Sequence, residues 1–256
     1  MRGLQGWNSA GPQTAEEMIA EARKAFFVMF GFMVVIWALQ IVNWTGNYQL
    51  DREFMVIPQR PDRLGEIFTA PFLHFSWAHI EGNSGPLFVF GFLAAYRGVV
   101  RFLWLTLLVA VTSGLAIWIF QNTNTGSVGA SGLIFGYFGY VVLRGIFDRR
   151  LIDTLIGVVM AASFAYLVTI ALPGTPGVSW LAHMGGLVGG VVGAWLLRDR
   201  RPQVAAGPPD SGRGSGTGTG SGSGPGKTIV PTQGTNPALE GSRSDLHKEL
   251  GDLGLL

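Results

Sequence analysis

Residues 129–147 read GASGLIFGYFGYVVLRGIF, and this stretch gives the clearest indication of the fold. Beyond its first two residues it is predominantly apolar and long enough for a membrane span, which needs roughly 20 residues with a range of about 17–25. Gly132, Gly136 and Gly139 recur along it, and small residues let helices pack closely in lipid. The stretch therefore predicts a membrane helix that packs tightly against a neighbour and carries a serine, Ser131, at its beginning.

The same apolar pattern recurs along the chain. Runs of spanning length occur at about residues 26–44, 72–96, 102–120, 131–147, 152–172 and 178–197. Only 13% of the residues are charged, against about 25% in soluble domains. The sequence thus predicts an all-α membrane protein with six transmembrane helices. It contains no cysteine, which excludes disulfides and thiolate metal sites, and a positive-inside bias explains the net charge of +2 without nucleic acid.

Charged residues lie between the apolar runs and indicate the orientation, because Lys and Arg are enriched on the cytoplasmic side. Basic residues precede the first run and follow the second, fourth and sixth, at Arg23, Lys24, Arg97, Arg101, Arg149, Arg150, Arg198, Arg200 and Arg201. The connections 121–130 and 173–179 carry no charge. We therefore expect a multi-pass protein of the cell membrane with both termini in the cytoplasm and the long 45–71 connection outside.

Three regions are expected along the chain. Residues 1–25 form a cytoplasmic segment in which Thr14 and Glu17 have the spacing of a capping box and open a short interfacial helix. Residues 26–200 form the six-helix membrane domain. Residues 201–256 are rich in Gly, Ser, Thr and Pro. Such a segment cannot bury enough apolar surface to fold, so we expect a disordered cytoplasmic tail.

Polar side chains gather at one depth of the predicted bundle. A cytoplasmic arginine follows Ser131 after 13 residues (Arg144), Asn83 after 14 (Arg97) and His183 after 15 (Arg198). With a rise of 1.5 Å per residue, all three lie about 20–22 Å above the arginines, in the outer half of the membrane. His79 lies one turn above Asn83 on the same helix face. Because polar groups at this depth are costly, the grouping indicates a functional site.

The group suits acyl transfer by a serine nucleophile. A serine hydroxyl needs a base to take its proton, and an imidazole such as that of His183, with an ordinary pKa of about 6.5, is suitable. The third, fifth and sixth spans hold no Asp or Glu in their cores, and Glu81 projects from a different helix face than His79 and Asn83. The sequence therefore predicts a Ser131–His183 dyad without an acid.

Acyl transfer also needs donors aimed at the developing oxyanion. Ser131 lies at a helix start, where backbone N–H groups are unpaired. The Asn83 amide and the His79 imidazole add side-chain donors. Gly129 and Gly132 allow close backbone approach around the nucleophile.

The fourth and sixth spans each carry a face of small residues, which we expect to bring Ser131 and His183 into contact. On the sixth span this face consists of Gly185, Gly186, Gly189, Gly190 and Gly193. Phe135 follows Ser131 by one turn and is predicted to stack beneath the His183 ring.

These motifs resemble those of the rhomboid family of intramembrane serine proteases. The glycine-x-serine-glycine motif lies at residues 129–132, and the histidine and asparagine four residues apart in the second span are His79 and Asn83. The sixth-span pattern is matched by Ala182, His183, Gly186 and Gly190. The resemblance covers about residues 22–200. A tryptophan–arginine pair that is common in the family's first outer loop is not evident.

The resemblance implies a serine endopeptidase that cleaves single-span or multi-span membrane proteins in the bilayer, without metal, cofactor, nucleotide or nucleic acid. Ser131 would form an acyl-enzyme, and His183 would act as base and then as acid. His79, Asn83 and the Ser131 backbone would hold the oxyanion. Supporting positions would be Gly129, Gly132, Phe135, Gly186 and Gly190.

Two other interpretations are weighed against this one. An inactive rhomboid relative would bind transmembrane clients, but such relatives usually lack the serine or the histidine, and this chain has both. A small transporter or channel is favoured by inverted repeats or by paired spans broken near the midplane, and the sequence shows neither.

Overall fold

A computed structural model describes residues 14–171, 173 and 178–199. The chain divides into two units, residues 1–203 and 204–256, and all described residues belong to the first. The predicted disordered tail, residues 201–256, lies outside the described residues. The same holds for residues 1–13 of the predicted N-terminal segment.

Within the described part of the chain, the structure is helical, as the sequence predicts. The elements are α1 (Ala15–Thr45), α2 (Gln49–Phe54), η2 (Pro61–Phe68), η3 (Ala70–Phe72), α3 (Trp77–Ala95), α4 (Val99–Phe120), α5 (Ser131–Asp148), α6 (Leu151–Ser163), α7 (Tyr166–Ala171) and α8 (Trp180–Leu196). Here η2 and η3 are 3₁₀ helices. Among these residues, strand-like pairing is limited to one antiparallel bridge between Val56 and Ser127.

The first helix corrects one prediction. The capping box is present, since Glu17 N donates to Thr14 Oγ1 at 3.2 Å and Thr14 N donates back to the Glu17 carboxylate. However, it does not open a separate short helix. The helix continues for 31 residues, through the expected beginning of the first span at Phe26. The reason is local, because residues 18–25 contain neither glycine nor proline and therefore nothing that ends a helix.

Two of the described helices, α1 and α4, are both long and apolar enough to cross a membrane, while α6 and α8 are shorter apolar helices. The expected span at 152–172 is divided into α6 and α7, with the break between Ser163 and Tyr166. The expected span at 72–96 begins as α3 only at Trp77. The number of six spans therefore remains a prediction.

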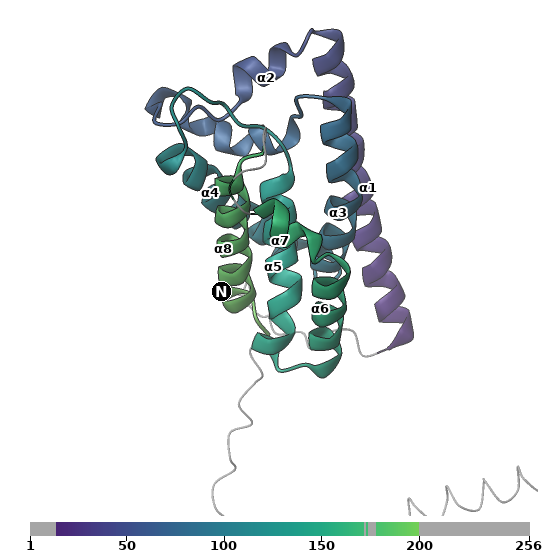
Figure 1. Cartoon of the computed structure of the whole chain (residues 1–256). Coiled ribbons are helices and arrows are strands. Elements are labelled where there is room, and N and C mark those ends of the chain that lie inside the picture. The colour runs from purple at the N-terminus through teal and green to yellow at the C-terminus, as the bar shows by residue number, and fades with distance from the viewer. Residues whose placement is uncertain (1–13, 172, 174–177, 200–256) are drawn as a thin grey trace, which may run out of the picture. The chain divides into compact units, whose positions relative to one another are not determined.

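Helix α5 lies at the centre of the helices and contacts α3, α4, α6 and α8, while α1 packs on α3 (Figure 1). The contact between α5 and α8 involves the backbones themselves. A Cβ atom on Gly186 would collide with the carbonyl oxygen of Gly132, and one on Gly190 would collide with that of Gly136. The small-residue faces predicted on these two stretches therefore do meet.

Ion pairs bring several predicted turns to one end of the bundle, which is called the arginine end below. They connect the α3–α4 turn, the α5–α6 turn and the segment after α8. The pairs join Arg97 to Asp153, Arg101 and Arg150 to Asp199, and Arg144 to Asp148 and Asp153. These basic segments therefore share one end of the molecule, as expected from the charge pattern.

The backbone contact between α5 and α8 predicts how glycine substitutions change stability. We expect Gly190→Ala to lower the free energy of unfolding by about 1–3 kcal/mol, the cost of overpacking a tight interior. In Gly31→Ala the added Cβ meets no atom within 4 Å. This control should be neutral or gain about 0.5–1 kcal/mol, because alanine is the better helix former. Thermal unfolding in detergent, followed by tryptophan fluorescence, measures the difference. Equal melting temperatures for the two variants would contradict the close contact.

Candidate active site

A cavity of about 180 Å³ collects the predicted catalytic side chains. Ser131, His183, His79 and Asn83 all line it, together with residues of η2, η3 and α4. These four residues come from three different helices, so their meeting depends on how the helices pack. Their shared depth, read from the sequence, predicts this meeting.

Ser131 is the first residue of α5. The first N–H groups of a helix have no acceptor within it, so the Ser131 N–H points out of the helix end. The two preceding residues are held by the segment before α3, because Gly129 N donates to Ala70 O at 2.9 Å and Ala130 N to His74 Nε2 at 3.5 Å. The nucleophile candidate therefore follows a loop whose backbone is fixed.

His183 lies in the first turn of α8 and is 1% exposed. Its ring stacks on Phe135 of α5, with the ring centroids 4.2 Å apart and an interplanar angle of 18°. This is the stacking that the sequence predicts. Ser113 of α4 adds a bond to the same turn, because its hydroxyl donates to Ala182 O at 3.1 Å. The plane of the imidazole is thus set by packing against α5.

His79 and Asn83 approach the Ser131 loop from α3. A Cβ atom on Gly129 would lie 2.7 Å from His79 Nε2 and 3.7 Å from Asn83 Nδ2, so both side chains face that glycine closely. Asn83 is 8% exposed, and its Nδ2 hydrogen-bonds to no other described residue. A buried amide donor without a partner is uncommon in proteins. This donor is available to a ligand in the cavity.

Two further ionisable residues of this region, Glu81 and His74, have different surroundings. Glu81 is exposed on α3, whereas His79 and Asn83 on either side of it line the cavity. It therefore projects away from the cavity and from a different helix face than His79 and Asn83, as the sequence predicts. His74 is fully buried, and its ring meets that of His79 edge-on with centroids 5.0 Å apart. Its contacts make it a support for Ala130 and His79.

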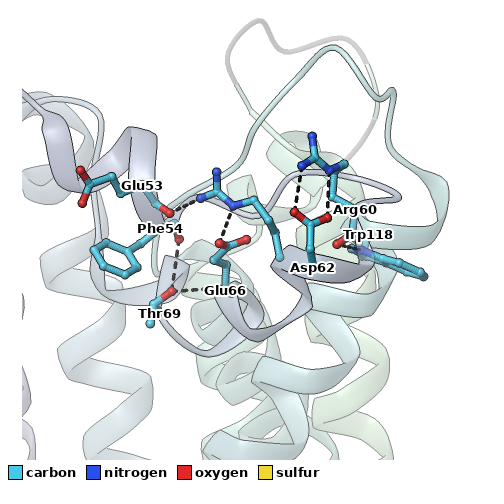
Figure 2. A network of polar contacts seen from close by, with 8 residues as sticks. Glu53, Phe54, Arg60, Asp62, Glu66, Thr69 and Trp118 are labelled. Atoms are coloured by element: carbon cyan, nitrogen blue, oxygen red, sulfur yellow. Dashed lines mark hydrogen bonds and ion pairs between the residues drawn. The ribbon is translucent and has the colours of Figure 1, made fainter.

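The connection between α1 and α3 forms part of the cavity wall and is held by its own polar contacts (Figure 2). Arg63 donates to the Glu66 carboxylate at 2.5 Å and to Glu53 O. Thr69 Oγ1 lies 3.2 Å from both Phe54 O and Glu66 O. These bonds hold the connection, in which the tryptophan–arginine pair described above is not evident.

Two further contacts attach this connection to neighbouring segments. Trp118 of α4 donates its indole N–H to Arg60 O at 3.2 Å (Figure 2). Val56 and Ser127 exchange backbone hydrogen bonds of 3.0 and 3.1 Å. The wall of the cavity is therefore continuous from the long connection to the loop that carries Ser131.

Some residues of the cavity were not predicted from the sequence. Ser113, Ser127 and Ser179 line it, and Gln121 bonds to two of them. Gln121, Ser127 and Ser179 lie in short connections without a periodic pattern, and Ser113 is a single small polar residue within the apolar helix α4, so the sequence carries no signal that singles them out.

Comparisons with known proteins agree with the motifs. The model of the Rhomboid domain family matches residues 61–200. An uncharacterized protein of Mycobacterium tuberculosis is 34% identical over 174 residues, covering 65% of this chain and 72% of that protein. A similar protein of Mycobacterium leprae is 35% identical over 173 residues, covering 65% and 68%. The chloroplastic Rhomboid-like protein 11 of Arabidopsis thaliana is 34% identical over 145 residues, covering 52% of each chain.

The contact between Gly129 and His79 generates a second prediction. Gly129 and Gly98 both have positive φ, at 125° and 116°, so alanine at either position pays backbone strain on the order of 1–3 kcal/mol. Only at position 129 does the new Cβ also meet a side chain, that of His79. We expect Gly129→Ala to lower the melting temperature more than Gly98→Ala. Combining each with His79→Ala should remove the excess, and an excess that persists would contradict the contact.

Proposed function

Because this chain belongs to the rhomboid family, we propose that it is an intramembrane serine endopeptidase that works through a Ser131–His183 dyad. One observation carries the proposal. Ser131 and His183 line a single cavity with the oxyanion candidates His79 and Asn83, while Phe135 stacks on the His183 ring. Nucleophile, base and donors are the parts that acyl transfer requires.

In the proposed reaction, His183 takes the proton of Ser131 Oγ while that oxygen attacks the carbonyl carbon of the scissile peptide bond. The carbon–nitrogen bond then breaks, and the His183 imidazolium gives its proton to the leaving amine. This leaves an ester between Ser131 and the new carboxyl end of the substrate. His183 next takes a proton from water, whose oxygen attacks the ester, and returns a proton to Ser131 as the acid product leaves.

The negative oxygen of the tetrahedral intermediate lies beside three donors. They are the Ser131 N–H at the start of α5, the Nδ2 group of Asn83 and the imidazole of His79. The contacts of Gly129 with His79 and Asn83 support this assignment, because they place both donors against the loop that precedes Ser131. The positive end of the α5 dipole adds to the stabilisation of negative charge.

Gly132, Gly186 and Gly190 act indirectly in this proposal. They let α5 and α8 approach until backbone touches backbone. Phe135 then meets His183 from below. We assign these residues, with Gly129, to the support of the dyad.

We further propose that six helical segments cross the cell membrane, namely α1, α3, α4, α5, α6 with α7, and α8. In this proposal the arginine end faces the cytoplasm together with the segment after α8, and Arg23 and Lys24 before residue 26 support placing the other end of the domain there as well. The substrates are single-span or multi-span membrane proteins, which reach the cavity from the bilayer. The chemistry uses only side chains, backbone N–H groups and water. Residues 1–25 and 201–256 flank this domain on the cytoplasmic side.

Replacing the two members of the dyad tests the proposal. In mild detergent, we expect the wild type to cleave a model single-span substrate. Ser131→Ala and His183→Ala should each lower the activity by about 10⁴-fold or more, because removing either member disables the whole unit. A fluorophosphonate probe should label the wild type and not Ser131→Ala. Undiminished cleavage by Ser131→Ala would contradict the dyad.

A silent wild type separates two cases. Labelling at Ser131 without cleavage identifies an active enzyme given the wrong substrate. A folded protein that neither cleaves nor reacts with the probe would instead favour the inactive relative that binds membrane clients.

Removing the Asn83 amide tests the oxyanion assignment. We expect Asn83→Ala to lower kcat by about 10²–10³-fold, the usual effect of one lost oxyanion donor. Glu81→Gln, two residues away on the exposed face of α3, is the matched control and should keep kcat within about twofold of the wild type. Steady-state kinetics on the same substrate measures both. If Asn83→Ala raises KM and leaves kcat unchanged, the amide binds substrate and does not stabilise the oxyanion.

A further inference from the structure

We propose that Gln121 is a positioning residue that connects the loop carrying Ser131 to the helix turn carrying His183. The proposal rests on the proposed function, because it assigns the residue a role in aligning that dyad. Gln121 directly follows α4, and its N–H donates to Ile117 O at 2.9 Å. Its backbone therefore remains attached to the end of a long helix, while its side chain is free to reach across.

The two ends of the Gln121 amide bond to different segments. Its Nε2 donates to Ser127 Oγ at 2.8 Å and to Thr125 Oγ1 at 3.0 Å. Its Oε1 accepts from Ser179 Oγ at 2.6 Å and lies 3.2 Å from Ser127 Oγ. Ser127 and Ser179 both line the cavity. One planar amide thus joins two polar groups of the cavity wall.

On the nucleophile side, Ser127 precedes Ser131 by four residues and is 8% exposed. Its backbone is paired in both directions with Val56. The bond from Gln121 adds a side-chain attachment to this backbone pairing. Ser127 is therefore held from two directions at the beginning of the short stretch that ends in the nucleophile.

On the base side, Ser179 is the N-cap of α8. Its hydroxyl accepts from Ala182 N at 3.3 Å, and its carbonyl accepts from the backbone N–H of His183 itself at 3.3 Å. A displacement of Ser179 therefore moves the turn on which His183 sits. Gln121 contacts this cap directly, so it can transmit the position of α4 to the base.

A glutamine suits this place because its amide carries both donors and an acceptor. Glutamate keeps the acceptor for the Ser179 hydroxyl and loses the donor toward Ser127, whereas alanine loses both. The chemistry is sensitive to such changes, since misplacing a reacting group by about 1 Å costs on the order of 10²-fold in rate. The order of activity expected is wild type, then Gln121→Glu, then Gln121→Ala.

The test compares Gln121→Ala and Gln121→Glu with Thr123→Ala, an exposed substitution in the same connection. Rates are normalised to the amount of enzyme that finally reacts at Ser131 with a fluorophosphonate. We expect Gln121→Ala to lower kcat and the labelling rate by about tenfold or more with KM within about twofold. Gln121→Glu should recover part of this loss, and Thr123→Ala should match the wild type. A purely structural role would reduce the amount of reactive enzyme and leave kcat per reactive site unchanged.

Coupling between the two segments is measured independently of activity. In hydrogen exchange followed by mass spectrometry, Gln121→Ala should speed exchange in peptides covering both 127–131 and 180–184, with α1 as the internal reference. In a Ser179→Ala background, Gln121→Ala should cost less than it does alone. A wild-type kcat in Gln121→Ala, or faster exchange in only one of the two peptides, overturns the inference. A wild type that neither cleaves nor labels overturns the protease assignment instead, and the exchange data then still decide whether Gln121 couples the segments.

Discussion

The carbonyl oxygens of Gly132 and Gly136 lie where any side chain at Gly186 and Gly190 would have to be. Among apolar helices in lipid, water supplies little drive for association, and close packing of backbones takes its place. The approach of α5 to α8 is thus the contact on which the site depends. It lays Phe135 against His183 and directs the start of α5 toward the first turn of α8. A larger residue on either face would therefore move the start of α5, with Ser131, away from the first turn of α8, which carries His183.

The remaining walls of the cavity are held by polar contacts from outside this pair. Ala70 and His74 fix the backbone before Ser131, and Gln121 joins Ser127 to Ser179. The helices place Ser131 and His183 approximately, and the hydrogen bonds of these short connections hold the backbone around both residues. Such a division is physically reasonable, because a helix is rigid along its length while the residues at its end are positioned by whatever they bond to.

The sequence predicts the helical part of the site well, and for a clear reason. A helix advances by a constant rise per residue, so counting from the arginines places Ser131, Asn83 and His183 at one depth, and the structure gathers them in one cavity. The same regularity predicts that Phe135 lies beneath His183. Irregular segments have no constant rise per residue, so counting residues does not place their side chains. Bonds between Gln121 and Ser179, 58 residues apart, or between Thr69 and Phe54 O, 15 residues apart, follow from the folded path of the chain. The continuous α1 and the break after Ser163 also escaped prediction, because apolar content alone marks neither beginnings nor interruptions of helices.

The ion pairs at the arginine end have a consequence for how the protein is made. Arg97 pairs with Asp153, 56 residues later, and Arg101 with Asp199, 98 residues later. During synthesis these arginines leave the ribosome well before their partners exist. Under the proposed orientation, they therefore still lack these aspartate partners at the moment when basic residues retain a loop in the cytoplasm. Only later do the aspartates arrive and neutralise them. Under that orientation the same charges act twice, first as a signal for insertion and afterwards as ion pairs that hold the assembled helices together.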